Sequence, residues 1–201
     1  VGRNGGAVCT SSNARAVLEW AFGRGDKVLF FPDQHLGRNT GVAMGYSLDE
    51  MVVWNPRREC GGLNEAEVKE ARFLLWRGHC SVHQRFGASH IDVFRSEYPD
   101  GQVGSTDFII RTVEAAAPGS AIGIGTEIHL VHRLAADNPD KHVVSLDPML
   151  CPCSTMFRID APHLAWVLEG LVKGEVRNRI TVDADTREWA RVALDRMLAI
   201  T

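Results

Sequence analysis

Two stretches of this chain repeat one pattern at the same spacing, and this internal repeat restricts the fold more than any other feature. In the first stretch, Ser12 precedes a helical pattern and a short apolar run, and His35 follows. In the second stretch, Thr106 precedes the same two elements, and His129 follows. Both intervals, Ser12 to His35 and Thr106 to His129, are 23 residues long. Matched spacing indicates two copies of one supersecondary unit, with a boundary in the region 80–86.

The spacing of apolar residues predicts helices that alternate with strands. Short apolar runs predict strands at 27–31, 51–54, 121–124 and 141–146. Helical spacing predicts helices at 13–22, 64–76, 107–117, 128–136, 163–172 and 186–200, with Asn64 as the cap of the second helix. Alternation of this kind is typical of parallel sheets covered by helices, so the predicted fold class is α/β with repeated three-layer α/β/α units and short parallel sheets.

Composition excludes several classes of protein. The 201 residues carry a net charge of −3, and this balance does not predict nucleic-acid binding. No apolar run approaches the ~18 residues that cross a membrane, and no secretory signal is present. There is no glycine-rich phosphate loop and no Gly-x-Ser-x-Gly nucleophile elbow. The five cysteines therefore predict a cytoplasmic protein in which thiols bind metal or do redox chemistry, and the start at Val1 predicts a fragment or a processed chain.

Hydroxyl residues stand in pairs at two predicted helix starts. Ser11 and Ser12 precede one helix, and Ser105 and Thr106 precede the other. The free backbone N–H groups of a helix start, together with such hydroxyls, can hold a carboxylate or a phosphate. Serine and threonine are also ordinary helix caps, so both interpretations stay open.

Three cysteines lie in loops that suit metal binding. Cys80 lies in a polar loop between two histidines, and Cys151 and Cys153 follow the strand predicted at 141–146. Zinc sites usually show two close ligand pairs, whereas thiolates from distant loops are typical of iron–sulfur clusters. Inert buried cysteines and a zinc module on Cys151, Cys153 and nearby histidines remain alternatives, and Cys9 and Cys60 are interpreted as bystanders.

Taken together, these motifs resemble the quinolinate synthase family. The resemblance follows the family's order over nearly the whole chain. It rests on seven stretches: CTSSNA (9–14), FFPDQHLGRNT (30–40), VVWNP (52–56), RGHCSVHQRF (77–86), GSTDFII (104–110), IGTEIHLVHRLAADNPDK (124–141) and CPCSTM (151–156).

The resemblance implies three similar α/β domains that are pseudo-symmetric around a central site. It implies condensation of iminoaspartate with dihydroxyacetone phosphate to give quinolinate for NAD biosynthesis, with L-aspartate oxidase or aspartate dehydrogenase as the source of iminoaspartate. A 4Fe-4S cluster would be held by one cysteine from each domain, leaving one iron open as a Lewis acid. The implied domains are 1–82 (second domain), 83–157 (third domain, internally shortened) and 158–201 (C-terminal helices).

Two cluster ligands carry over by position. Cys80 matches the ligand of the second domain. For the third domain the family pattern is Cys-x-x-Met, which Cys153 and Met156 fit, and Cys151 before its proline is the alternative.

The substrate residues carry over in the same way. Ser12 matches the substrate-binding serine of the second domain, and Thr106, with Ser105 beside it, matches the hydroxyl site of the third. Glu127 matches a family glutamate without an assigned role, and no residue is assigned as catalytic.

The departures from the family pattern predict an incomplete copy. The first domain, with its cluster cysteine, has no counterpart, and Gln102 alone stands where the family carries a strand and a His-Pro-Glu-Cys motif. With two cluster ligands instead of three, cluster binding should be weak and the chain alone inactive. The lost strand should leave the third domain's sheet short of a member. The alternative function is a non-catalytic α/β remnant that binds a small anion or a metal.

Overall fold

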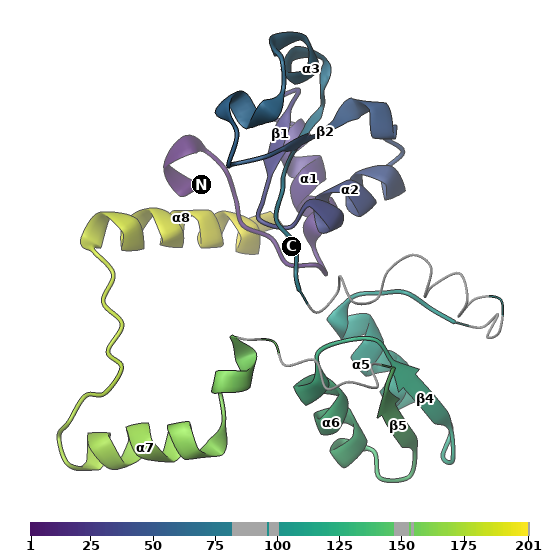
Figure 1. Cartoon of the computed structure of the whole chain (residues 1–201), viewed down its shortest axis with the longest axis vertical. Coiled ribbons are helices and arrows are strands. Elements are labelled where there is room, and N and C mark those ends of the chain that lie inside the picture. Colours follow the sequence, from purple (N-terminus) through teal and green to yellow (C-terminus); the bar gives the residue numbers. More distant parts are fainter. Residues whose placement is uncertain (82–95, 97–100, 147–152, 154, 201) are drawn as a thin grey trace. The chain divides into compact units, whose positions relative to one another are not determined.

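The computed structural model describes residues 1–81, 96, 101–146, 153 and 155–200 (Figure 1). The chain divides into two compact units, one of Val1–Cys80 with Asp183–Thr201 and one of Ser81–Val182. Each unit joins short parallel strands through helices, so the α/β fold class predicted from the alternating pattern is confirmed. None of the helices in the described ranges is both long and apolar enough to cross a bilayer.

The sheet of the first unit has three parallel strands. These are β1 (Val28–Phe30), β2 (Met51–Trp54) and β3 (Phe73–Trp76). β3 lies between the other two, and Phe73 is opposite both Val28 of β1 and Met51 of β2. Phe73 and Leu75 are 0% and 1% exposed. The centre of the hydrophobic core is therefore on the strand that comes last in this unit's sheet.

The single helix predicted at 64–76 is wrong. A short helix, α3 (Glu65–Glu70), begins at the predicted cap Asn64, which exchanges hydrogen bonds with Glu67 in a capping box. The backbone is extended at Ala71, with a ψ of 141°, and the chain then forms β3. The apolar run from residue 73 to residue 76 buries more apolar surface as the central strand of the sheet than it would as the end of an exposed helix.

Three further helices complete the first unit. α1 (Ala14–Phe22) and α2 (Gln34–Ala43) pack against each other, and three short 3-10 turns lie at Gly2–Asn4, Leu48–Glu50 and Glu59–Gly62. α8 (Ala184–Ile200) also belongs to this unit, because Nη1 of Arg196 donates to the carbonyl oxygens of Gly2 at 2.7 Å and Gly6 at 2.9 Å. The last helix thus returns to the first residues of the chain.

The second unit has a smaller sheet. Its elements are α5 (Thr106–Ala115), β4 (Ala121–Ile124), α6 (Ile128–Asp137), β5 (His142–Ser145), a 3-10 turn at Met156–Arg158 and α7 (Ala161–Val172). β4 and β5 pair in parallel, and Ile124 and Val143 pack with Val113 of α5 and Val131 and Leu134 of α6. Within the described ranges this sheet has two strands, and the predicted shortage of a strand stays a prediction.

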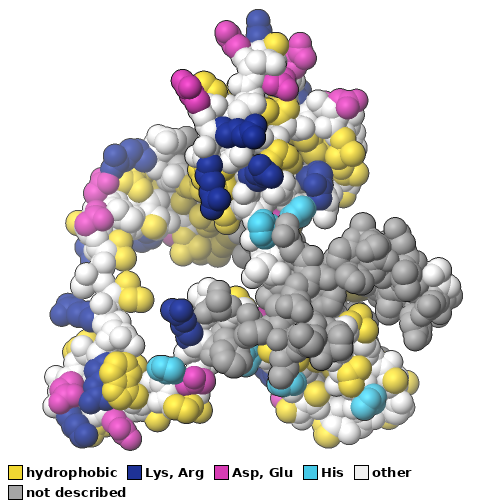
Figure 2. Space-filling model, in the orientation of Figure 1, with side chains coloured by type: hydrophobic (Ala, Val, Ile, Leu, Met, Phe, Trp, Pro, Cys, Tyr) yellow, Lys and Arg dark blue, Asp and Glu magenta, His cyan; other side chains and the backbone are white. Residues whose placement is uncertain are grey.

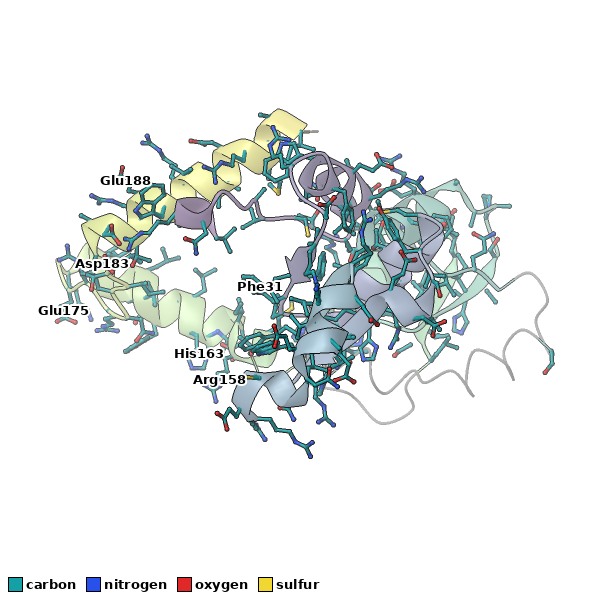
Figure 3. The ribbon with its side chains drawn as sticks, turned by 90° about the horizontal axis from the view of Figure 1, so that it is seen from above. Phe31, Arg158, His163, Glu175, Asp183 and Glu188 are labelled. Carbon is teal, nitrogen blue, oxygen red and sulfur yellow. The ribbon has the colours of Figure 1, made fainter. Side chains whose placement is uncertain are left out.

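One face of the β4–β5 sheet is open to solvent among the described residues. Ile124 and Val143 are buried on the covered face, whereas Gly123 and Val144 are exposed on the other. α7 is also exposed along much of its length, as the apolar side chains on its surface show (Figure 2). Its cap residue is Asp160, whose carboxylate accepts the backbone N–H of His163 at 2.8 Å. His163 is labelled in Figure 3. Parallel sheets are normally covered on both faces, so the described part of this unit exposes surface that such sheets usually bury.

The two units share one order of elements. The first has α1, β1, α2 and β3, with β1 paired to β3, and the second has α5, β4, α6 and β5, with β4 paired to β5. The segment with β2 and α3 is additional in the first unit, because it lies between α2 and β3 and has no counterpart between α6 and β5. The repeat predicted from the sequence therefore corresponds to matching topology.

Candidate functional site

The loop that carries Cys80 lies against the start of α2. Its first residue, Arg77, follows β3 and donates its backbone N–H to the carbonyl of Trp54 at 2.9 Å. The backbone N–H of Gln34 donates to the carbonyl of Gly78 at 3.0 Å. A side chain at Gly78 would collide with the carbonyl of Pro32, so only glycine permits this approach. The loops that follow β1 and β3 are thereby joined at the carboxyl edge of the sheet, where α/β proteins bind ligands.

Asp33 holds this arrangement together with both of its carboxylate oxygens. Oδ1 caps α2 by accepting the backbone N–H groups of His35 at 2.8 Å and Leu36 at 2.9 Å. Oδ2 accepts the backbone N–H of Cys80 at 3.1 Å. Cys80 itself is a partly buried free thiol. The sequence did not single out Asp33, although an aspartate directly before a helix is a capping signal.

His35 lies in the first turn of α2, next to this acid. Its Nδ1 lies 2.8 Å from Nη2 of Arg38, and since a guanidinium only donates, Nδ1 accepts and Nε2 carries the proton. Nε2 is buried and has no hydrogen-bond partner within the described part of the chain. A buried donor without a partner among the described residues therefore remains in the first turn of α2.

The start of α1 lies at the same edge of the sheet. α1 leads into β1 through a short turn, so it runs antiparallel to β1 and begins where β1 ends. Ser12 is exposed in the turn before α1, and Asn13, not Ser12, occupies the cap position. The hydroxyl of Ser12 is thus not used to cap the helix.

In the second unit, Glu127 occupies the position equivalent to Asp33. Its Oε2 accepts the backbone N–H groups of His129 at 2.9 Å and Leu130 at 3.4 Å, and its Oε1 lies 2.6 Å from Nδ1 of His129. Its side chain is only 13% exposed. The sequence left Glu127 without a role, and the structure shows that it caps α6 and orients His129.

The second hydroxyl pair also stands at a helix start. Ser105 caps α5 by accepting the backbone N–H of Phe108 at 3.3 Å, and Thr106 is exposed as the first residue of the helix. The two pairs are therefore similar in position but not in detail, because only Ser105 is a cap.

The environment of Cys153 favours its thiolate. Backbone N–H groups of Met156 and Thr155 lower the pKa of the Cys153 thiol, and the nearby negative charge of Glu127 opposes that shift. The Cys-x-x-Met spacing has a physical reason here. It lets the backbone N–H groups of Thr155 and Met156, at the start of the turn at Met156–Arg158, donate to the sulfur of Cys153. A stabilised thiolate is the form that binds metal.

The remaining cysteines differ from Cys153. Cys9 packs against the core of the first unit, and burial raises the pKa of its thiol. Cys60 is exposed, in the 3-10 turn at Glu59–Gly62. Cys151 lies outside the described residues, so the choice between Cys151 and Cys153 stays a prediction.

The donor set decides what metal chemistry this chain could support. Among the described residues no three Cys, His, Asp or Glu side chains form a group that could hold a metal ion. Cys80 and Cys153 are both partly buried free thiols, and the pKa of Cys153 is lowered. The described part of the chain therefore shows separate candidate thiols and no complete metal site.

The structure defines an α/β protein in which Asp33 holds the backbone of Cys80 at the carboxyl edge of one parallel sheet, and in which the other unit carries Cys153, a thiol with a lowered pKa. The family described as "Quinolinate synthetase A protein" matches residues 3–103 and 101–199. Quinolinate synthase of Corynebacterium glutamicum is 53% identical over 217 residues, which cover 100% of this chain and 55% of that protein. The enzymes of Rhodopirellula baltica (48% identical, 99% of this chain, 55% of that protein) and Geobacillus thermodenitrificans (46%, 100%, 59%) are also similar. The chain belongs to the quinolinate synthetase A family.

The same comparisons describe how this chain differs from its relatives. It spans only 55% to 59% of the length of the three relatives named above. The alignment with the C. glutamicum protein has 217 positions, whereas the chain has 201 residues, so at least 16 of those positions have no counterpart here. The two family matches meet at residues 101–103. This junction agrees with the gap predicted at Gln102.

Proposed function

We propose that this chain is part of a quinolinate synthase, which condenses iminoaspartate with dihydroxyacetone phosphate to give quinolinate, two waters and phosphate. The observation that carries the proposal is identity of about half of all residues to proteins named quinolinate synthase, across the whole chain. The reaction belongs to NAD biosynthesis in the cytoplasm. L-Aspartate oxidase or aspartate dehydrogenase would supply the iminoaspartate.

The hydroxyls at the helix starts are proposed to bind the acidic groups of the substrate. Ser12 and Thr106 are exposed next to α1 and α5, whose first backbone N–H groups favour anions. The oxygen of Ser105 is engaged as a cap, which leaves its O–H free to donate. A carboxylate or phosphate would therefore meet hydroxyl and backbone donors together.

Cys80 and Cys153 are proposed as ligands of a 4Fe-4S cluster. When bound, such a cluster supplies an open iron site that polarises a substrate oxygen. The contribution of this chain would be to fix the two sulfurs. Asp33 orients the Cys80 loop through the backbone N–H of Cys80, and the donors around Cys153 lower the pKa of that thiol.

We further propose that the chain is inactive without the positions its relatives carry at the junction near Gln102. The two-stranded β4–β5 sheet with one open face supports this, since a missing strand would both complete the sheet and supply side chains to the site. A hybrid protein tests the proposal. The region of C. glutamicum quinolinate synthase that matches this chain is replaced by this chain, once as it stands and once with the relative's unmatched internal positions inserted at Gln102.

The proposal predicts quinolinate formation from iminoaspartate and dihydroxyacetone phosphate by the hybrid with the insertion and none by the hybrid without it. Activity in neither hybrid, with both folded by circular dichroism, favours the alternative of a non-catalytic α/β remnant that binds an anion or a metal. Activity in both contradicts the importance of the missing segment.

A further inference from the structure

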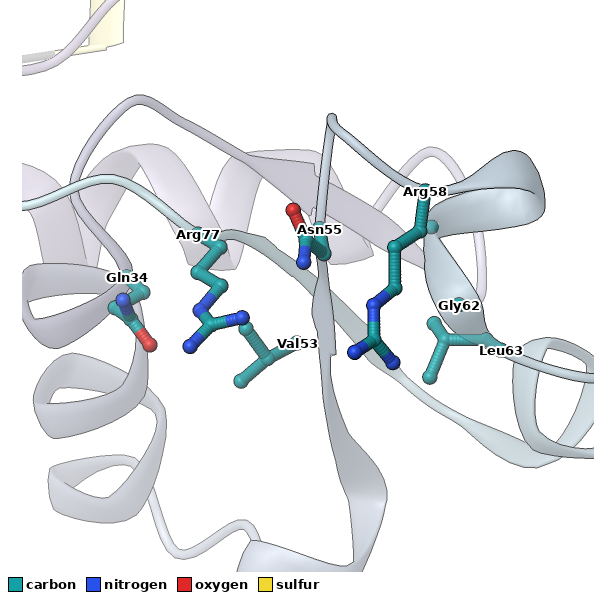
Figure 4. Close-up of a pocket in the computed structure, with 8 residues that line it drawn as sticks. Gln34, Val53, Asn55, Arg58, Gly62, Leu63 and Arg77 are labelled. Atoms are coloured by element: carbon teal, nitrogen blue, oxygen red, sulfur yellow. The ribbon is translucent and has the colours of Figure 1, made fainter.

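A pocket of about 360 Å³ lies at the carboxyl edge of the first unit's sheet (Figure 4). It is lined by residues from the ends of β2 and β3, from the start of α2 and from the turn after β2. The residues that carry the argument are Gln34, Val53, Asn55, Arg58, Gly62 and Arg77. We call it the Arg58–Arg77 pocket. Its volume is typical of sites for small molecules and exceeds many times the roughly 30 Å³ of one water.

Two guanidinium groups enter this pocket from different elements. Figure 4 shows the side chains of Arg58 and Arg77 reaching into it near Val53 and Asn55. Arg77 is fixed by its backbone hydrogen bond to Trp54 at 2.9 Å, and Arg58 by its backbone hydrogen bond to the carbonyl of Asn55 at 3.1 Å. The backbone of each arginine is therefore held at the carboxyl edge of the sheet.

The lining contains no acidic residue to neutralise these charges. Within the described ranges, neither Arg58 nor Arg77 takes part in an ion pair. Asn55 adds a donor, because its Oδ1 accepts the backbone N–H of Arg57 at 3.1 Å and its Nδ2 remains available. Two like charges in one pocket repel each other, and an anion that binds both removes this cost.

The glycine at position 62 leaves space for the side chain of Arg58. Gly62 has a φ of +76°, and a Cβ at this position would lie 2.8 Å from Cδ of Arg58. The turn at Glu59–Gly62 thus needs glycine both for its backbone and to leave room for the arginine. The arrangement is specific to this unit, because the segment with β2 and α3 has no counterpart in the second unit.

We propose that the Arg58–Arg77 pocket binds phosphate, either as the free ion or as the phosphate group of a small metabolite. A guanidinium matches a phosphate through two parallel hydrogen bonds, and two guanidinium groups match its double charge. The proposal does not rest on the proposed reaction, since the pocket includes none of the residues assigned to the substrate or the cluster.

Titration calorimetry on the full chain at low ionic strength tests the proposal, with inorganic phosphate, glycerol 3-phosphate and succinate as probes. We expect both phosphates to bind. Arg58→Gln and Arg77→Gln should each weaken phosphate binding by about tenfold or more, because each removes charge-assisted hydrogen bonds. Arg57→Gln is the matched control, since this neighbouring exposed arginine does not line the pocket. The phosphate affinity of this variant should stay within about twofold of that of the parent. Circular dichroism checks that each variant is folded.

Arg77→Lys is a second variant that guards against loss of binding through misfolding. It keeps the positive charge but cannot donate two parallel hydrogen bonds, so we expect a phosphate affinity between those of the parent and Arg77→Gln. Gly62→Ala should weaken binding by displacing Arg58, whereas Gly45→Ala should not, since Gly45 has a φ of +94° and open space around it. The proposal is overturned if neither inorganic phosphate nor glycerol 3-phosphate binds, if Arg57→Gln weakens binding as much as Arg58→Gln does, or if succinate binds as tightly with the same dependence on both arginines. Binding of only one of the two phosphates supports it and identifies the source of the group.

Discussion

Replacing Asp33 with alanine tests the contact that ties the Cys80 loop to α2. The change removes two cap hydrogen bonds to the start of α2 and the bond to the backbone N–H of Cys80. Losing a cap costs about 0.5–2 kcal/mol, and a hydrogen bond to a charged group contributes about 1.5–3 kcal/mol. Because Asp33 is partly exposed, the lower part of each range applies. We expect Asp33→Ala to lower the free energy of unfolding by about 2–3 kcal/mol.

Asp33→Asn separates the two contributions. Asparagine caps helices about as well as aspartate, but it would set its NH₂ group against the N–H of Cys80, so we expect a loss of about 1–2 kcal/mol. Asn64→Ala is the matched control, because it removes the cap of α3 and leaves the contact between Asp33 and Cys80 in place. Its expected cost is about 1 kcal/mol.

Urea unfolding followed by circular dichroism measures these free energies, and the rate of Cys80 alkylation, followed by mass spectrometry, measures the exposure of the loop. We expect Cys80 to react faster in both Asp33 variants than in Asn64→Ala. The reasoning is refuted if Asp33→Ala costs less than about 0.5 kcal/mol, the usual effect of a surface substitution. It is also refuted if the alkylation rate of Cys80 is the same in all three variants.

Three further predictions use other parts of the chain. Alkylation of Cys153 should persist to lower pH than alkylation of Cys9, since hydrogen bonds lower one pKa and burial raises the other; equal pH midpoints in mass spectrometry would contradict this. Phe73→Ala should destabilise the first unit by about 3–5 kcal/mol in urea unfolding, whereas Leu29→Ala, at a side chain 50% exposed, should cost far less. The backbone N–H of His163 lowers the pKa of Asp160. The ionised carboxylate of Asp160 therefore stabilises α7 at neutral pH, and this stabilisation is lost as the pH falls through that lowered pKa. The helical circular dichroism signal of Asp160→Asn should change less than that of the parent when the pH is lowered.

The sequence predicted the alternation of helices and strands because local signals mark most of the boundaries. Asn64 does cap a helix, and the predicted helix at 128–136 is close to α6, Ile128–Asp137. The failure at β3 has a different cause. The residues 73–76 suit a helix or a strand, and only the neighbours β1 and β2, distant in sequence, decide in favour of the strand.

The candidate site was predicted only in part, for a similar reason. Motifs singled out Cys80 and Cys153, but the bond from Cys80 to Asp33 joins residues 47 positions apart. The Arg58–Arg77 pocket likewise forms only when β2 and β3 end side by side. Contacts of this kind depend on strand order, which no local pattern contains.

The central claim is that Cys80 and Cys153 ligate one iron–sulfur centre. It is tested most directly by measuring iron and acid-labile sulfide in the hybrid with the insertion after anaerobic reconstitution. We predict that Cys80→Ser and Cys153→Ser each lower the bound iron and sulfide, while Cys60→Ser leaves both unchanged. Equal iron and sulfide in all three variants, or no cluster in the parent hybrid, would contradict the claim.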